Sequence, residues 1–389
     1  MSFYRNANEQ SFIEKLGQSV KGFADRAPYY DEERTFHHED IEELKAIGYT
    51  KATLPTQYGG KGIDLYTYLL AQETIARYSG ATALAIGWHC GIVLELQDPN
   101  RKWNPALLDE VFTKVGEGSL INRAASEPQT GSPTRGGRPV TTAIKKDGKW
   151  IINGKKTYTS LAPALDLFLV SAWIPEEEKV GWFLVSRENE GVSIEYTWDV
   201  MSMQGTGSED LILDGVQLED MYLAEYAEKE HPVDSSWLLH IPACYIGIAG
   251  AAREAAIDFA VHYSPNSITG TISDLPAVQA KIGEMELKWL QSRHFLYSVA
   301  AQWLSQPNDK GNLRPQLGAV KKAVTNEAVD IVDKAMRIVG AKSLQSTNPL
   351  QRYYRDVRAG LHNPPMDDAV LQNLAFQAIH NIKKTTEAL

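Results

Sequence analysis

The stretch that decides the fold is Ala124-Ala125-Ser126-Glu127-Pro128-Gln129-Thr130-Gly131-Ser132, followed later by Asn153-Gly154-Lys155-Lys156-Thr157-Tyr158-Thr159-Ser160. The first run is rich in small residues, whose backbone N–H groups and hydroxyls could meet a planar, polar ligand. The second run follows a strand-like pattern. Because loops held by a rigid sheet often carry functional residues, we predict a binding loop at 124–132.

The residues between the two runs predict strands and tight turns. Val140, Thr142 and Ile144 alternate with other residues, which is the period of a β-strand. Asp147-Gly148 and Asn153-Gly154 each predict a hairpin turn, because these dipeptides tolerate the positive φ angles of such turns. We therefore expect two turns within a small β domain.

Helical patterns flank this β region on both sides. Upstream, 40–46 and 67–78 carry apolar residues near one face, and Gly48 follows the first segment as a helix stop. Downstream the apolar period returns to that of a helix, and the clearest stripe, within 320–338, stops at Gly340. The predicted fold class is α+β with three domains: a helical domain at 1–120, a small antiparallel β domain at 121–230, and a four-helix bundle at 231–389.

Composition narrows the class of protein. The chain has 389 residues and a formal net charge of −10, which argues against a nucleic-acid-binding surface. Cys90 and Cys244 lie in apolar settings and are expected to be buried free thiols. No run approaches the ~20 apolar residues of a membrane span. We expect a cytoplasmic protein.

Several motifs together resemble the acyl-CoA dehydrogenase family. They are Glu127-Pro128 with Gly131-Ser132, Asn153-Gly154-Lys155-Lys156, Asp166, Arg337-Ile338-Val339-Gly340-Ala341 and Arg352-Tyr353-Tyr354-Arg355-Asp356. The resemblance implies the same order of helical, β and helical domains, an acyl-CoA substrate and FAD as cofactor. It also implies a redox partner or oxygen as electron acceptor, and a homodimer or homotetramer with the flavin at a subunit interface. Arg355 and Asp356 can alternatively form a structural ion pair.

The resemblance also implies which residues hold the cofactor. They are Ala125, Ser126, Ser132, Tyr158, Thr159, Ser160 and Gly340. Ala125 and Ser126 would lie along the flavin ring, Tyr158 would cover its dimethylbenzene side, and the Ser160 hydroxyl would reach N5, the atom that accepts the hydride. At Gly340 the backbone N–H groups would approach the pyrophosphate of a neighbouring subunit's FAD.

Two positions depart from the family pattern. A family dehydrogenase needs a carboxylate base, yet Pro364 occupies the position of the usual glutamate, and 237–242 holds no glutamate either. Asp367 and Asp368 are the nearest candidates for a displaced base, or they simply begin the next helix, where carboxylates are favourable. The segments 263–270 and 275–279 also lack the family's FAD-binding residues, so FMN is possible.

Two further functions stay open beside the dehydrogenase. His362-Asn363-Pro364 resembles a pattern of flavin-dependent monooxygenases with the same fold, in which His362 would bind an oxygenated flavin or take a substrate proton. The other alternative is a protein that binds acyl-CoA or flavin without turnover.

Overall fold

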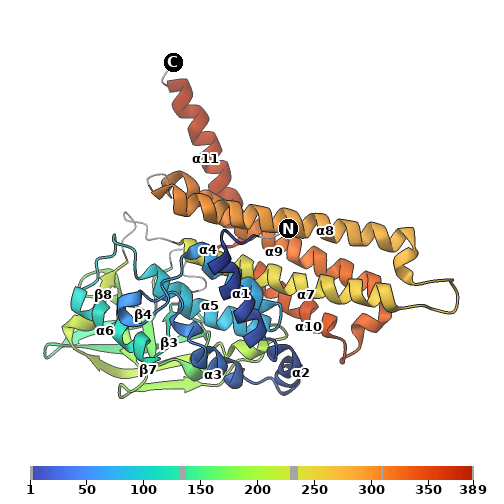
Figure 1. Cartoon of the computed structure of the whole chain (residues 1–389). Helices are drawn as coiled ribbons and strands as arrows, with labels where there is room; N and C mark the ends of the chain where they lie inside the picture. Colours follow the sequence, from blue (N-terminus) through green and yellow to red (C-terminus); the bar gives the residue numbers. More distant parts are fainter. Residues whose placement is uncertain (1–2, 131–136, 228–234, 308–309, 388–389) are drawn as a thin grey trace.

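The computed structural model describes residues 3–130, 137–227, 235–307 and 310–387. Figure 1 shows the strands at one end of the molecule together with α6, the long C-terminal helices at the other, and the remaining N-terminal helices between them. The N-terminal helices are α1 (Ala7–Ser19), α2 (Phe23–Glu33), α3 (His38–Ala46), α4 (Leu65–Ala76), α5 (Gly80–Glu95) and α6 (Pro105–Glu117). Gly48 follows α3 with a φ of 70°, so the predicted helix stop is confirmed.

The middle of the chain forms one sheet of eight strands. They are β1 (Ile121–Ala124), β2 (Thr142–Lys146), β3 (Lys149–Thr159), β4 (Leu167–Ile174), β5 (Lys179–Ser186), β6 (Val192–Glu195), β7 (Glu209–Leu218) and β8 (Leu223–Tyr226). The order is β6-β7-β3-β2-β4-β5-β8, with β1 beside β4. Most pairings are antiparallel as predicted, but β4 pairs with both β1 and β2 in parallel, so the sheet is mixed.

One predicted turn is confirmed and the other is wrong. Asp147 and Gly148 have φ angles of 51° and 80° and join β2 to β3. At Asn153-Gly154, however, β3 runs straight on with a shift in its pairing to β7. A Cβ at Gly154 would lie 2.3 Å from Thr141 Oγ1. The glycine therefore permits close packing within a continuous strand instead of a reversal.

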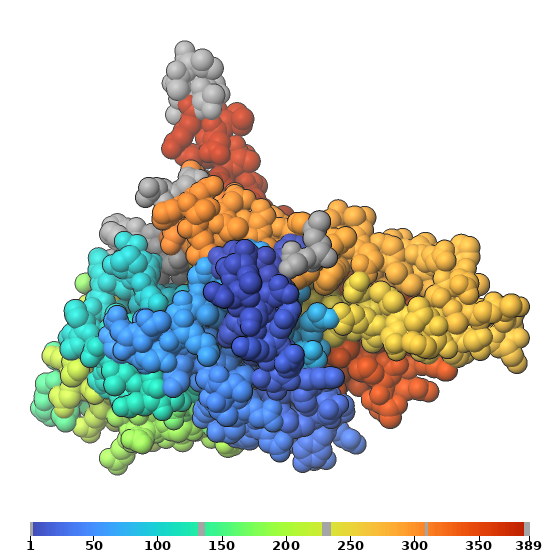
Figure 2. Space-filling view, in the orientation of Figure 1, coloured from blue at the N-terminus to red at the C-terminus, as the bar shows by residue number. Residues whose placement is uncertain are grey.

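Four long helices follow the sheet. They are α7 (His240–His262), α8 (Pro276–Ser305), α9 (Lys310–Val339) and α11 (Asp367–Glu387), with the shorter α10 (Pro349–Asp356) between the last two. α7, α8 and α9 pack side by side, and α9 ends at Gly340 as predicted. α11 contacts α9 and then stands away from the body of the chain (Figures 1 and 2). The bundle within one chain is therefore less complete than the four-helix prediction implies.

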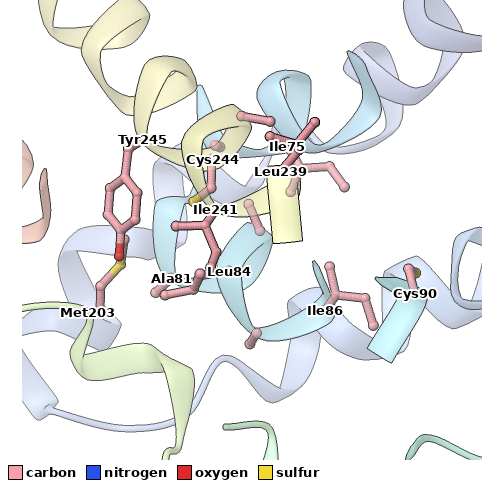
Figure 3. Close-up of a cluster of buried hydrophobic side chains, with 14 of the residues drawn as sticks. Ile75, Ala81, Leu84, Ile86, Cys90, Met203, Leu239, Ile241, Cys244 and Tyr245 are labelled. Atoms are coloured by element: carbon pink, nitrogen blue, oxygen red, sulfur yellow. The ribbon is translucent and has the colours of Figure 1, made fainter. Parts of the chain in front are cut away.

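A continuous apolar core joins all three regions. Its α4, α5 and α7 surfaces pack together, and Met203 of the β region enters the same cluster, with Tyr245 pointing towards it (Figure 3). Cys90 and Cys244 are buried free thiols, as predicted. Since this core contains residues from all three regions, it does not mark where one domain ends and the next begins. The division into three domains at residues 120 and 230 stays a prediction. Within the described ranges, no helix has the length and apolar character needed to cross a membrane.

His89 links the helices to the sheet. Its Nε2–H donates to the Thr50 carbonyl at 2.8 Å, and its Nδ1 accepts from Ile121 N at 3.0 Å. The ring is fully buried, and burial lowers the pKa of His89 to about 4, against the smaller opposing effect of its backbone hydrogen bonds. The neutral imidazole thus fixes β1, and the loop after it, against α5.

Candidate flavin site

The end of β3 presents a strained and exposed aromatic side chain. Tyr158 has a φ of 56°, a left-handed conformation that bulky residues rarely adopt. Its side chain is 64% exposed and meets Trp198 edge-on, with ring centroids 5.8 Å apart. Such strain persists where the surroundings impose it, and it often marks a binding site.

Ser160 lies in a chain of hydroxyl groups. Its Oγ is 2.8 Å from Ser208 Oγ, which is 2.8 Å from Thr206 Oγ1, and Thr206 donates to the Met203 carbonyl at 2.9 Å. Thr159 is fully buried, and its hydroxyl makes no hydrogen bond within the part of the chain that the structure describes. The segment 158–160 therefore offers one oriented hydroxyl and one unsatisfied hydroxyl.

The loop after β1 lies beside this segment. Ala125 and Ser126 are partly exposed, and the Ser126 carbonyl accepts from Thr157 N at 2.9 Å. The structure thus brings together five of the predicted cofactor residues: Ala125, Ser126, Tyr158, Thr159 and Ser160. Ser132 lies outside the described residues. A partly exposed surface of loop backbone and one tyrosine ring, with the buried hydroxyls of Thr159 and Ser160 behind it, fits a planar, polar ring such as a flavin.

A buried ion pair that the sequence reasoning missed anchors this loop. Lys156 Nζ lies 2.6 Å from Glu127 Oε1, and the side chains are 0% and 1% exposed. The carboxylate also accepts from Val140 N at 2.6 Å and Thr141 N at 3.0 Å. Burial alone would raise the pKa of Glu127, but the donors around it, Lys156 first, hold it below its ordinary value. Glu127 therefore stays ionised and ties β1 to β2 and β3.

A second set of contacts joins the β region to the C-terminal helices. Asp356 Oδ1 accepts from Met203 N at 2.7 Å, next to the hydroxyl chain of Ser160. Arg355 instead pairs with Asp31 through two contacts of 3.0 and 2.5 Å. The alternative interpretation, an ion pair between Arg355 and Asp356, is wrong: Arg355 pairs with Asp31, and Asp356 accepts from the backbone of Met203. Burial raises the pKa of Asp356 above its ordinary value.

The predicted base candidates lie in and after the loop between α10 and α11. Tyr245 Oη donates to Asn363 Oδ1 at 2.6 Å, and the Pro364-Pro365 bond is cis. His362 and Asp368 are exposed. Asp367 is partly buried at the start of α11, where its Oδ2 accepts from Asn326 Nδ2 at 2.9 Å. The position of the usual glutamate therefore holds a proline, with Asp367 close by in the chain.

Gly340 lies apart from the other predicted cofactor residues. It has a φ of 69° and is exposed, and no atom lies within 4 Å of where a Cβ would stand. A neighbouring cavity of about 400 Å³ is lined by Phe259 and Tyr263, whose rings stack at 4.8 Å. Lys342 Nζ lies 4.1 Å from the Tyr263 ring centroid. An aromatic stack, a cation and an open glycine turn fit an adenine–phosphate group.

Comparison with known proteins identifies the chain's relatives. Residues 9–98, 122–216 and 239–363 match the N-terminal, middle and C-terminal domains of acyl-CoA dehydrogenase, respectively. The chain is 51% identical over 380 residues to "Putative acyl-CoA dehydrogenase YdbM" of Bacillus subtilis strain 168, covering 97% of this chain and 99% of that protein.

Two solved structures share the fold. Butyryl-CoA dehydrogenase from Megasphaera elsdenii superposes with a TM-score of 0.86 at 19% identity, over 97% of this chain and 100% of that one. KijD3 in complex with FMN and a dTDP-linked amino-keto sugar gives 0.84 at 21% identity, over 97% and 95%. The chain shares the fold of both proteins, and it belongs to the acyl-CoA dehydrogenase family.

Proposed function

We propose that this enzyme oxidises the Cα–Cβ bond of an acyl-CoA thioester, with FAD as its cofactor. The observation that carries the proposal is the surface formed by Tyr158, Ser160 and the loop 125–126, in a chain that belongs to this family. A strained tyrosine and an oriented hydroxyl on a rigid strand are suited to holding one face and one edge of a planar ring.

The chain's own residues have three tasks in this reaction. When bound, the flavin supplies an acceptor for the hydride at N5. Ser160 would hydrogen-bond that edge of the ring, because the chain through Ser208 fixes its hydroxyl. Tyr158 would cover the dimethylbenzene side of the ring. A base in the 362–368 segment would take the acidic α-proton of the thioester.

Asp367 is the base candidate that the geometry supports best. It is partly buried and follows the prolines at 364–365, whereas His362 and Asp368 are exposed. Its contact with Asn326 also suits a residue that simply begins α11, so the test must separate the two roles. Asp367→Asn, Asp368→Asn and His362→Ala should be compared, and only loss of flavin reduction without loss of folding identifies a base.

A monooxygenase is the alternative that a specific observation favours. The described site has no carboxylate at position 364, and His362 is exposed on the adjacent turn. The KijD3 complex shows that this fold also accommodates FMN together with a ligand that is not an acyl-CoA. In a monooxygenase the bound flavin would supply the reaction with oxygen, and His362 would hydrogen-bond the cofactor or take a proton from the substrate.

The cavity at Phe259 and Tyr263 supports FAD over FMN. Lys342 and the backbone of Gly340 would contact the pyrophosphate of an FAD molecule, and the stacked rings of Phe259 and Tyr263 would contact its adenine. This FAD would be the one bound by a second subunit. Release of the flavin by heat and its chromatographic identification tests this directly. Recovery of FMN alone would contradict the assignment and leave this cavity without a role in cofactor binding.

Assembly with a second copy is part of the proposal. α11 exposes the apolar residues Leu371, Phe376, Ile379 and Ile382, at 53%, 72%, 57% and 70%. In a monomer these apolar side chains would stay exposed to water, which is unfavourable. A homodimer or homotetramer that covers this surface accounts for its apolar character.

The deciding experiment is an anaerobic titration of the flavin-loaded protein with acyl-CoAs of different chain length, following flavin absorbance. Bleaching by one chain class is expected from a dehydrogenase. No bleaching, followed by rapid oxygen consumption when reduced flavin is supplied, would support the monooxygenase. A protein that binds acyl-CoA or flavin but gives neither signal would be non-catalytic.

A further inference from the structure

Three hydroxyl groups form a chain that runs inward from Ser160. The Oγ of Ser160 lies 2.8 Å from that of Ser208, which lies 2.8 Å from Thr206 Oγ1, and Thr206 Oγ1 lies 2.9 Å from the Met203 carbonyl oxygen. The exposed fraction falls from 8% at Ser160 to 4% at Ser208 and 1% at Thr206. Ser160 is therefore the end of the chain that a ligand can reach.

The inner end of the chain is fixed in place. Met203 N donates to Asp356 Oδ1 at 2.7 Å, and the Met203 carbonyl also accepts from Trp198 Nε1 at 3.2 Å and from Thr206 N at 3.1 Å. A carbonyl oxygen carries no hydrogen, so it can only accept. Contacts from α10 and from the β region thus hold the acceptor at which the chain begins.

This acceptor sets the direction of every hydrogen bond in the chain. Each hydroxyl has one hydrogen, and two oxygens at these distances repel each other unless a hydrogen lies between them. Thr206 must give its hydrogen to the Met203 carbonyl, so Ser208 must donate to Thr206. Ser160 must then donate to Ser208. Its single hydrogen is committed to the chain, and towards a ligand the Ser160 hydroxyl can only accept.

We propose that Ser160 accepts a hydrogen bond from N5–H of the reduced flavin, and that the hydroxyl chain thereby favours binding of reduced over oxidised flavin. In the oxidised ring N5 has a lone pair and no hydrogen, so it would face a second lone pair at Ser160. In the reduced ring N5 carries a hydrogen and can donate. This inference rests on the proposed function, which places N5 at Ser160.

The consequence for the proposed reaction is a bias towards hydride acceptance. The β-hydrogen of the thioester would leave with its electron pair and become the hydrogen on N5, while the α-proton goes to a base. The thioester loses two electrons and the flavin gains them. A hydrogen bond that forms as the hydride arrives favours the transfer without tightening the oxidised complex.

The test measures the midpoint potential of the flavin in the loaded protein, by anaerobic reduction against a reference dye and without acyl-CoA. Ser160→Ala should lower the ratio of reduced-flavin to oxidised-flavin affinity about tenfold, since one neutral hydrogen bond contributes on that scale. For a two-electron couple this is a fall of about 30 mV.

Ser208→Ala is the decisive variant, because it keeps the Ser160 hydroxyl and removes only the partner that takes its hydrogen. Ser160 can then donate to N5 of the oxidised ring, so the potential should fall by a similar amount. A purely structural contact would weaken both redox states alike and leave the potential in place. The matched control is Ser202→Ala in the same loop. Its hydroxyl contacts the Asp356 carbonyl at 3.4 Å, outside the chain, so the potential should not change.

Equal potentials in the wild type and in Ser208→Ala, or a higher potential in the variant, would overturn the inference. If Ser208→Ala does not fold, Thr206→Val provides the second test. It removes the acceptor of the Ser208 hydrogen and nearly keeps the side-chain shape, so it should lower the potential in the same way. An unchanged potential in Thr206→Val would likewise count against the inference.

Acyl-CoA titration of the same samples separates this inference from the proposed function. Bleaching by acyl-CoA, with a potential that Ser208→Ala leaves unchanged, would retain the dehydrogenase and reject the inference. A potential that depends on Ser208, without bleaching by any acyl-CoA, would retain the inference and reject dehydrogenation. Absence of both effects would reject both.

Discussion

Replacing Glu127 by glutamine is expected to destabilise the protein by about 3–5 kcal/mol, the usual cost of removing one partner of a buried ion pair. In the variant Lys156 remains fully buried and keeps its contact with Ser171 Oγ, at 3.2 Å, but it faces a neutral amide instead of a carboxylate. In the wild-type protein the two carboxylate oxygens of Glu127 accept hydrogen bonds from Lys156 Nζ, Val140 N and Thr141 N. An amide has one acceptor oxygen, so at least one of these donors loses its partner.

The matched control is Glu195→Gln, because Glu195 pairs at 2.7 Å with Lys155, the residue next to Lys156. Those side chains are 54% and 40% exposed, so this change should cost less than about 1 kcal/mol. Urea unfolding of both variants, loaded with flavin, measures the difference. Flavin affinity should also fall in Glu127→Gln alone, because the loop 125–127 forms part of the proposed ring site.

Equal and small losses in the two variants would refute the reasoning that the buried pair holds the loop. The double variant Glu127→Gln with Lys156→Met identifies the source of a large loss. Removing both charges should recover part of the stability, since no uncompensated ammonium remains. If nothing is recovered, the backbone hydrogen bonds to 140–141 carry the effect.

Three further outcomes are expected. Tyr158→Ala and Ser160→Ala should each weaken flavin binding or slow its reduction, and wild-type flavin content and rates in both would show that the ring lies elsewhere. The double variant Phe376→Glu with Ile382→Glu should lower the molar mass of the protein in solution, as measured by light scattering. The reason is that charges on the exposed face of α11 oppose burial of this helix in an interface. An unchanged molar mass would place the interface elsewhere. In the folded protein the pKa of His89 is about 4, which is below its ordinary value. The unfolded chain therefore binds the proton more strongly than the folded chain does. As the pH drops from 6.5 to 4, the free energy of unfolding should fall by up to about 3 kcal/mol. Urea unfolding across this range should show a shallower pH dependence in His89→Gln, and an unchanged slope would contradict this.

The order of helices, strands and helices follows from local periodicity in the sequence. The Asp147-Gly148 turn and the helix ends at Gly48 and Gly340 were predictable for the same reason, because each depends on the φ angle of one or two residues. Asn153-Gly154 carries the same local signal, yet β3 passes through it. Pairing with β2 and β7 on both sides, and the approach of Thr141, outweigh the turn preference.

The cofactor surface was predictable only as far as the family resemblance reached. It named Tyr158 and Ser160, but the sequence has no signal for the hydroxyl chain to Ser208 or for the left-handed backbone at Tyr158. The absence of a glutamate at position 364 was visible directly. The residues that line a cavity beside Pro364 were not visible in the sequence, because the cavity walls come from four separate segments.

The two buried lysines show most clearly what tertiary structure decides. Lys155 and Lys156 are neighbours in one strand, and Lys321 and Lys322 are neighbours in one helix, so composition and charge cannot tell them apart. Strand register turns Lys156 towards Glu127 and leaves Lys155 at the surface, and the packing of α11 on α9 covers Lys321. The sequence alone determined the elements and their family. Which charge is buried, and therefore which can hold a loop, depended on contacts between segments far apart in the chain.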